Sequence, residues 1–195
     1  MFIQTEDTPN PDSLKFLPGA DILGAGALGR DFPTPASAAN ASPLAEVLFE
    51  VEGVRSVFLG PDFVTVTKAP KTNWAHVKPA ILGVIADHLA AGAPIISEAS
   101  APVQSLATSL DEYEAEDREV VEQIIELIET RVRPAVAADG GDIQFRHFEP
   151  KTGVVFLTLH GACSGCPSST MTLKAGIENM LKHYVPEVAS VEAAN

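Results

Sequence analysis

The chain has 195 residues, of which 46% are hydrophobic, and a formal net charge of −13 at pH 7. This composition predicts a globular protein with one or two hydrophobic cores of ordinary domain size. The excess of acidic residues argues against nucleic acid or anionic membranes as partners, because contacts with phosphate depend on clustered Lys and Arg. Acidic residues such as Asp87 and Glu126 interrupt the longest apolar stretches, so we expect no membrane-spanning helix.

The N-terminal residues carry acids at Glu6, Asp7 and Asp12. They lack the basic start of a secretory signal and the Arg-rich pattern of a transit peptide, which predicts a cytoplasmic protein. The cytosol keeps thiols reduced. A structural disulfide is therefore disfavoured, and metal binding or catalysis is the expected use of cysteine.

Residues 1–92 have the pattern of a small domain of mixed helices and strands. Strands are expected at residues 2–5 and 14–17, separated by a turn rich in Pro. A surface loop with some local structure should follow over residues 18–43, which are rich in Gly, Ala and Pro.

The remainder of this domain is expected to contain two helices and a hairpin. Ser42 and Pro43 are suited to the N-cap and first position of a helix that ends at Gly53. Residues 54–59 and 63–67 alternate around a Gly-Pro-Asp turn, which predicts a hairpin. An apolar stripe from Trp74 to Leu89 predicts the second helix, so the order is β-β-α-β-β-α.

A linker is expected at residues 93–110, and a second domain at 111–195. Its first helix should be acidic and end near Pro134, followed by a sharp turn at Asp139–Asp142. Further apolar patterns predict a hairpin, a helix that starts near Ser168 and a possible final strand, at residues 143–148, 154–159, 168–184 and 188–191. Both domains belong to the α+β class.

The only two cysteines, Cys163 and Cys166, lie in the sequence Gly-Ala-Cys-Ser-Gly-Cys-Pro-Ser-Ser-Thr at residues 161–170. A tetrahedral zinc site or a cubane-type iron-sulfur cluster uses about four protein ligands. One chain supplies two of them, so two chains would complete the set. A Cys-x-x-C pair can also close on itself as a redox disulfide.

The two cysteines are predicted to lie between the end of a strand and the N-terminus of a helix. Helix N-termini favour thiolates, the species that ligates metal, so we expect lowered thiol pKa values. Gly161 and Gly165 are small enough to let the backbone pass close to a bulky cluster. Ser168 to Thr170 are expected to cap the helix.

These motifs resemble those of the Nfu proteins, which carry and deliver iron-sulfur clusters and are related to the C-terminal domain of the NifU scaffold. In the second domain, the resemblance depends on residues 133–142, Arg-Pro-Ala-Val-Ala-Ala-Asp-Gly-Gly-Asp, and on the cysteine motif at 161–170. In the first domain it depends on four shorter matches, at residues 2–16, 31–32, 42–45 and 62–68.

The resemblance implies that Cys163 and Cys166 ligate a [4Fe-4S] cluster together with the same pair from a second subunit. It implies a homodimer when the cluster is bound, a cluster assembly scaffold upstream, and apo iron-sulfur proteins as recipients. The protein would carry a cluster without turning over a substrate, so we expect that it is not an enzyme.

The alternative is a thiol-disulfide oxidoreductase or a zinc-bridged binding protein that uses the same cysteine pair. Thioredoxin-type motifs lie in a βαβ unit. The loop here is expected between a hairpin strand and a helix, which favours the carrier.

The other motifs in the sequence give weaker indications of function. The Gly-x-Gly-x-x-Gly string at residues 24–29 is followed by Pro33 and Pro35, which disfavours dinucleotide binding. His160 could be an auxiliary ligand or a base, but a strand-end histidine is expected to face solvent. Asp139 and Asp142 are expected to serve a turn in which Gly140 and Gly141 have positive φ, although they could also shape partner binding.

Overall fold

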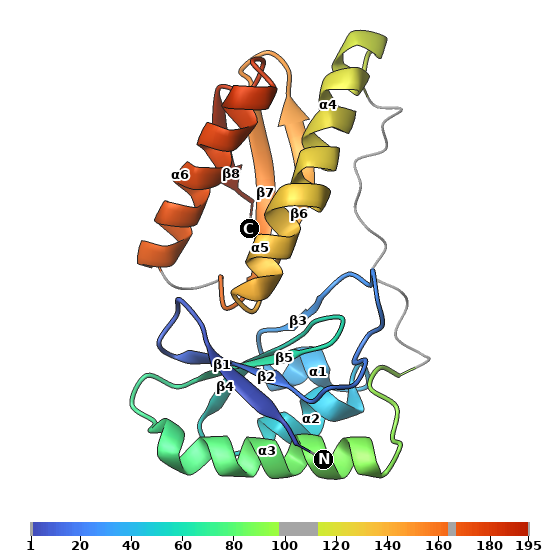
Figure 1. Ribbon diagram of the computed structural model, residues 1–195, viewed down its shortest axis with the longest axis vertical. Helices are drawn as coiled ribbons and strands as arrows, with labels where there is room; N and C mark the ends of the chain where they lie inside the picture. The colour runs from blue at the N-terminus through green and yellow to red at the C-terminus, as the bar shows by residue number, and fades with distance from the viewer. Residues whose placement is uncertain (1, 98–112, 164–166, 195) are drawn as a thin grey trace.

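A computed structural model of the chain describes residues 2–97, 113–163 and 167–194, with side chains from residue 171 onward in the last range. It contains two domains of mixed helix and strand, one above the other in Figure 1, which confirms the α+β class. Residues 98–110 of the expected linker lie outside the described residues. The boundaries 1–92, 93–110 and 111–195 therefore stay predictions.

The N-terminal domain is built on an antiparallel five-stranded sheet of order β1-β2-β5-β4-β3. Helix α3 runs along the side of this sheet that faces away from the C-terminal domain (Figure 1). The elements are β1 Gln4–Asp7, β2 Ser13–Leu17, β3 Arg30–Phe32, α1 Pro35–Ala38, α2 Pro43–Phe49, β4 Val54–Leu59, β5 Val64–Lys68 and α3 Trp74–Ala90.

The expected order of this domain omitted two short elements. Strand β3 and helix α1 both lie in the segment that was expected to be a loop. Three residues are too few to show alternation, and β3 forms because it pairs with the edge of β4. The N-cap at Ser42 is confirmed, since its hydroxyl accepts from the amide of Ala45 at 3.1 Å. Helix α2 ends at Phe49, earlier than the expected Gly53.

The C-terminal domain packs its helices on a three-stranded sheet of order β6-β7-β8. Strands β6 and β7 form the predicted hairpin, and β8 confirms the possible final strand and runs parallel to β7. The elements are α4 Ala115–Leu127, the π-helical segment η2 Ile128–Val132, α5 Arg133–Ala138, β6 Gly141–Glu149, β7 Val154–Gly161, α6 Pro167–Tyr184 and β8 Ser190–Ala193.

The prediction that the first helix of this domain ends near Pro134 is wrong, because helical backbone continues to Ala138. The π-helical turn at Ile128–Val132 precedes the proline and changes the hydrogen-bond pattern. Pro134 consequently lies in the first turn of α5, where a missing N–H is tolerated. The extension brings Arg133 and Asp139 beside the start of β6.

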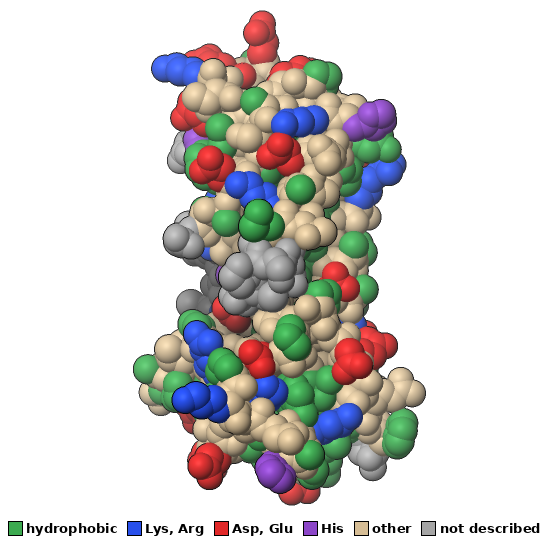
Figure 2. All heavy atoms as spheres, turned by 90° about the vertical axis from the view of Figure 1, so that its left-hand side faces the viewer, with side chains coloured by type: hydrophobic (Ala, Val, Ile, Leu, Met, Phe, Trp, Pro, Cys, Tyr) green, Lys and Arg blue, Asp and Glu red, His purple; other side chains and the backbone are tan. Residues whose placement is uncertain are grey.

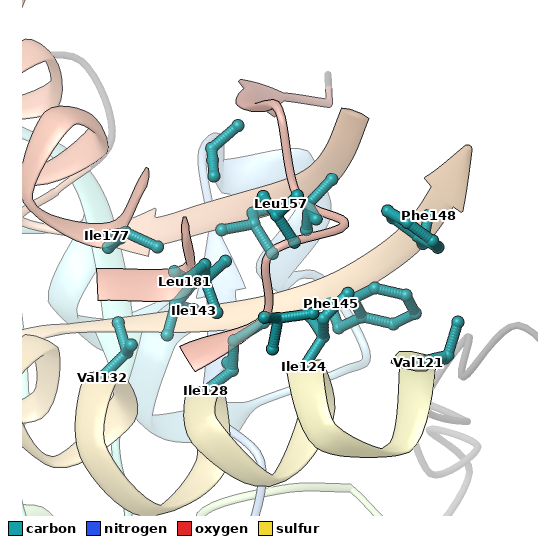
Figure 3. Close-up of a cluster of buried hydrophobic side chains, with 14 of the residues drawn as sticks. Val121, Ile124, Ile128, Val132, Ile143, Phe145, Phe148, Leu157, Ile177 and Leu181 are labelled. Carbon is teal, nitrogen blue, oxygen red and sulfur yellow. The ribbon is translucent and has the colours of Figure 1, made fainter. Parts of the chain in front are cut away.

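Each domain has its own buried hydrophobic core. In the C-terminal domain, one face of α4 and η2 packs against the sheet and against α6 (Figure 3). The side chains labelled there include Val121, Ile124, Ile128, Val132, Ile143, Phe145, Phe148, Leu157, Ile177 and Leu181. The two domains can therefore hold their folds without sharing a core.

The surface of the described residues is mixed in charge. Figure 2 shows one face of the molecule, on which acidic and basic side chains are interspersed over both domains. Within the described part of the chain, every helix is too short or too polar to cross a membrane.

Leu181 tests the core of the C-terminal domain, since its side chain is fully buried. Leu181→Ala should lower the free energy of unfolding of this domain by about 2–5 kcal/mol, because it leaves a cavity. Met171 lies on the same helix and is 72% exposed, so Met171→Ala should change that free energy by less than about 0.5 kcal/mol. Urea titration followed by circular dichroism measures both, and equal effects would contradict the packing.

Candidate functional site

Cys163 lies in the turn that follows β7, at the end of the C-terminal domain that faces the N-terminal domain. Its side chain is buried, with 5% of the residue exposed. The turn packs on the start of β6, since a Cβ added to Gly141 would lie 2.9 Å from the Cys163 Sγ. Cys166 and Gly165 lie outside the described residues, as do the side chains of Ser168 to Thr170, so the geometry of the pair stays a prediction.

The surroundings of Cys163 disfavour its thiolate. Burial, with a smaller contribution from the negative charge of Asp139, raises the pKa of Cys163 to about 12. The expectation of a lowered pKa at a helix N-terminus is therefore wrong for Cys163 in this arrangement. The cost of burying a charged sulfur is the largest cause of this shift.

A groove of about 640 Å³ opens beside Cys163. Its walls come from η2 and α5 on one side and from α6 on the other, and they are largely apolar. Pro9 of the N-terminal domain also lines it, together with Asp139 and Arg131. Within the described ranges no three side chains of the His, Cys, Asp and Glu types come together as a possible metal site.

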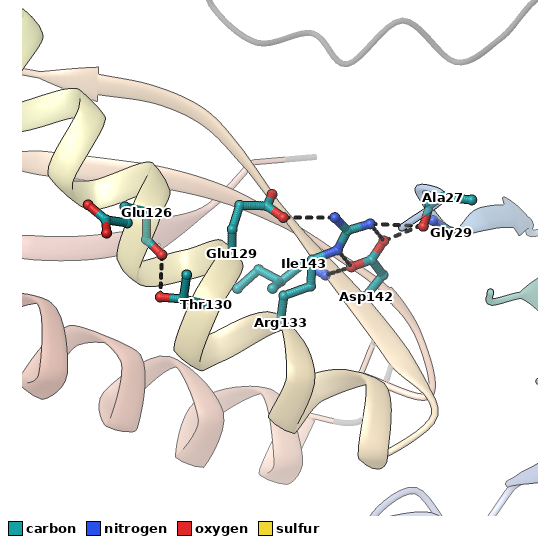
Figure 4. Close-up of polar contacts among 8 residues, drawn as sticks. All are labelled: Ala27, Gly29, Glu126, Glu129, Thr130, Arg133, Asp142 and Ile143. Carbon is teal, nitrogen blue, oxygen red and sulfur yellow. Dashed lines mark hydrogen bonds and ion pairs between the residues drawn. The ribbon is translucent and has the colours of Figure 1, made fainter. Parts of the chain in front are cut away.

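The carboxylate of Asp142 is the centre of a buried polar network at the start of β6 (Figure 4). Asp142 is 4% exposed. Arg133 donates to it from Nε at 2.8 Å and from Nη2 at 3.2 Å. The amide of Ile143 donates to it at 2.8 Å, and the amide of Gly29 donates to it at 3.0 Å. One carboxylate thus joins α5, β6 and a loop of the N-terminal domain.

Arg133 extends this network on both sides. It donates to Glu129 at 2.8 Å and to the carbonyl of Ala27 at 3.2 Å. Burial alone would lower the pKa of Arg133, but hydrogen bonds and charge from Asp142 and Glu129 outweigh it, so the pKa is raised. The guanidinium remains charged at any pH at which the protein is folded.

Three further side chains of the N-terminal domain donate to backbone carbonyls near Cys163. The hydroxyl of Thr65 donates to Gly140 at 2.8 Å. The ammonium of Lys15 donates to Ala138 at 3.2 Å, and the amide of Asn10 donates to Ala162 at 3.5 Å. The N-terminal domain is therefore docked on the two turns that border the cysteine.

His160 was expected to face solvent, but most of its side chain is buried. Only 19% of its side chain is exposed, and its Nδ1 lies 3.7 Å from the Asp31 carboxylate of the N-terminal domain. Its Nε2 is buried and has no hydrogen-bond partner among the described residues. Its neighbour Gly161 is covered by Phe58, since a Cβ on Gly161 would lie 2.9 Å from the Phe58 ring.

The turn at Asp139–Asp142 contains one residue of positive φ, Gly140 at 80°, so the expectation of two is wrong. The sequence interpretation assigned Asp142 to turn chemistry and missed its buried ion pair. The signal available was the joint presence of Arg133 and Asp142 within one motif. No sequence pattern indicated that Phe58, Thr65 and Lys15 contact the C-terminal domain, because these contacts depend on how the two domains dock.

The glycine string at residues 24–29 serves this docking. Gly24 and Gly26 have positive φ, at 92° and 77°. No helix follows the string before Pro35 in the described residues, and the Gly29 amide is already bonded to Asp142. The arrangement lacks the strand–turn–helix context that a dinucleotide site requires.

The role of the Asp142 carboxylate can be tested by Asp142→Asn. This substitution leaves the half-buried Arg133 without its main counter-charge and should lower the free energy of unfolding of the C-terminal domain by about 2–4 kcal/mol. Glu129 is the matched control, because it pairs with the same guanidinium but its side chain is 44% exposed. Glu129→Gln should cost less than about 1 kcal/mol in urea titrations. A cost for Glu129→Gln as large as that for Asp142→Asn would contradict the assignment.

Comparisons with known proteins match both domains. A family model described as the scaffold protein Nfu/NifU N terminal matches residues 3–92, and a NifU-like domain model matches residues 124–192. Among the relatives is a protein of Drosophila virilis named NFU1 iron-sulfur cluster scaffold homolog, mitochondrial. It is 52% identical over 192 residues, which cover 98% of this chain and 61% of that protein.

Other matches are similar. The homologue of the same name from Drosophila grimshawi is 53% identical over 191 residues, covering 98% of this chain and 61% of its own length. The chain thus spans less than two thirds of these relatives. The solution structure of a NifU-like protein from Saccharomyces cerevisiae is 32% identical, with a TM-score of 0.46, and the match covers 50% of this chain and 86% of that one.

The expectation of a cytoplasmic protein is wrong. The Drosophila relatives are named mitochondrial. The expectation depended on the composition of the first residues of the sequence, and the relatives are considerably longer than this chain. The composition of those residues does not decide the compartment.

Proposed function

Since the chain belongs to the Nfu family, with an Nfu/NifU N-terminal domain followed by a NifU-like domain, we propose that it is a mitochondrial iron-sulfur cluster scaffold. Cys163 and Cys166 would bind the cluster, and no substrate would be turned over. The observation that carries this proposal is the position of the cysteine motif, at the junction of β7 and α6 in a domain that matches the NifU-like model.

The number of ligands supports a cluster shared between two chains. The sequence contains two cysteines, and a [4Fe-4S] cluster uses about four protein ligands. A second copy supplies the other two through a two-fold, self-complementary contact. A cluster held at such a junction can leave when the junction opens. This property suits a protein that receives a cluster from an assembly scaffold and delivers it to apo-proteins.

The argument from topology against an oxidoreductase does not hold in the structure. Because β8 runs parallel to β7 across α6, the cysteine turn does begin a βαβ unit, so that criterion no longer separates the two functions. The burial and the pKa of Cys163 distinguish the carrier from the oxidoreductase better. A redox-active thiol is partly exposed with a lowered pKa, whereas Cys163 is buried and its pKa is raised to about 12.

A cluster is compatible with such a thiol because iron displaces the proton when it binds. A coordinating thiol is deprotonated outright by the charge of the metal, so a raised pKa in the metal-free chain weakens binding without preventing it. Asp139 adds negative charge beside the site, which opposes a thiolate more than it opposes a thiolate bound to iron.

The proposal is tested by anaerobic reconstitution with iron and sulfide, followed by visible absorption and Mössbauer spectroscopy. The chain should become brown and lose its colour to an apo-protein that requires a [4Fe-4S] cluster. Cys163→Ser and Cys166→Ser should each remove nearly all of the bound iron, because no other cysteine can substitute.

A colourless protein that retains zinc, or that cycles a disulfide between the two cysteines, would overturn the proposal in favour of its alternatives. Ser164→Ala is a control within the same motif. Because this substitution removes a hydroxyl and leaves both thiols in place, it should leave the iron content unchanged.

A further inference from the structure

Apart from the bond between Arg133 and Ala27, the contacts between the domains converge on one small part of the C-terminal domain. Those to the turn at residues 138–142 come from Lys15, Thr65 and Gly29. Those to residues 160–162 come from Asp31, Phe58 and Asn10. The first segment includes the start of β6 and lies next to Cys163 in space, whereas the second contains the end of β7 and directly precedes Cys163 in sequence.

Docking of the N-terminal domain also restricts the approach to the thiol. Pro9 lines the groove beside Cys163, and the neighbouring Asn10 is bonded to the carbonyl that immediately precedes the cysteine. Cys163 is 5% exposed in this arrangement. A second chain that contributes ligands to a shared cluster has to bring its own cysteine turn to the same place.

Apart from the packing of Phe58 on Gly161, the docked arrangement is held mainly by polar contacts that can be exchanged for water. Thr65, Lys15 and Asn10 donate to backbone carbonyls, which solvent can hydrate when the domains part. The two hydrophobic cores are separate, so parting exposes neither of them. Contacts of this kind between domains of one chain ordinarily permit relative motion.

We infer that the N-terminal domain and a second copy of the chain compete for one surface, formed by residues 138–142 and 160–163. The docked N-terminal domain covers the cysteine turn, and a second copy engages the turn after the N-terminal domain has moved away. This inference rests on the proposed function for the identity of the second occupant. The covering of Cys163 by the N-terminal domain does not depend on it.

The test measures how fast iodoacetamide alkylates Cys163 in the full chain without iron. All variants carry Cys166→Ser, so that Cys163 is the only thiol. Thr65→Val and Lys15→Met together remove two donors of the N-terminal domain without touching the C-terminal domain. Alkylation through an opened state is proportional to the open population. The rate should therefore rise about tenfold on loss of the two hydrogen bonds.

The chain offers a matched control for each substitution. Thr67 lies on the same strand as Thr65, but its hydroxyl pairs with Ser13 of its own domain at 2.8 Å. Lys78 donates to Thr5, also within the N-terminal domain, at 2.7 Å. Thr67→Val with Lys78→Met should leave the alkylation rate within about twofold of the parent, since the donors at the interface remain. Circular dichroism establishes that each variant is folded.

Small-angle X-ray scattering on the same samples makes every outcome decisive. Faster alkylation supports the inference whether or not the average radius of gyration grows, because a small open population is enough to react. Unchanged alkylation in a variant whose domains have separated overturns it, because Cys163 is then covered by its own domain alone. Unchanged alkylation without separation also overturns it, because these contacts then do not hold the covered arrangement.

The same substitutions in the chain with both cysteines separate this inference from the proposed function. If both hold, Thr65→Val with Lys15→Met should accelerate formation of the cluster-bound dimer during anaerobic reconstitution. Faster alkylation without any cluster would leave the covering intact and reject the proposed function. A cluster that forms at the parental rate in variants with faster alkylation would reject the competition.

Discussion

The arrangement around the cysteine turn depends on one buried carboxylate. Asp142 accepts from Arg133 of α5, from the amide that follows it in β6 and from Gly29 of the N-terminal domain. A buried carboxylate is stable only when paired and hydrogen-bonded, so Arg133 and the amide of Ile143 have to stay close to it, whereas water can replace the amide of Gly29 when the domains part. The π-helical turn before Arg133 and the left-handed Gly140 before β6 are the backbone features that bring them there.

This constraint has a consequence for the chemistry of Cys163. The packing of β6 against the cysteine turn leaves no room for a side chain at Gly141, and the thiol beside it is buried in the docked arrangement. Burial keeps the proton on sulfur, which protects the thiol from oxidation and alkylation while no iron is present. Under the proposed function, this protection would keep the ligand intact between two loading events.

The elements that the sequence predicted well are those with a local cause. Capping at Ser42, the two hairpins and the long amphipathic helices follow from propensity and periodicity over adjacent residues. Strand β3 was missed because pairing with β4 creates it. The cysteine motif was recognised from its spacing, whereas the roles of Phe58 and Thr65 arise from the docking of two domains, which leaves no periodic trace in the sequence.

Native mass spectrometry of the anaerobically reconstituted full chain tests the central claim most directly, because it counts chains and metal atoms in one particle. The proposed function predicts two chains with one cluster of four irons and four sulfides, and single chains after Cys163→Ser. A single chain that holds iron, or a dimer that holds zinc in place of the cluster, would contradict it.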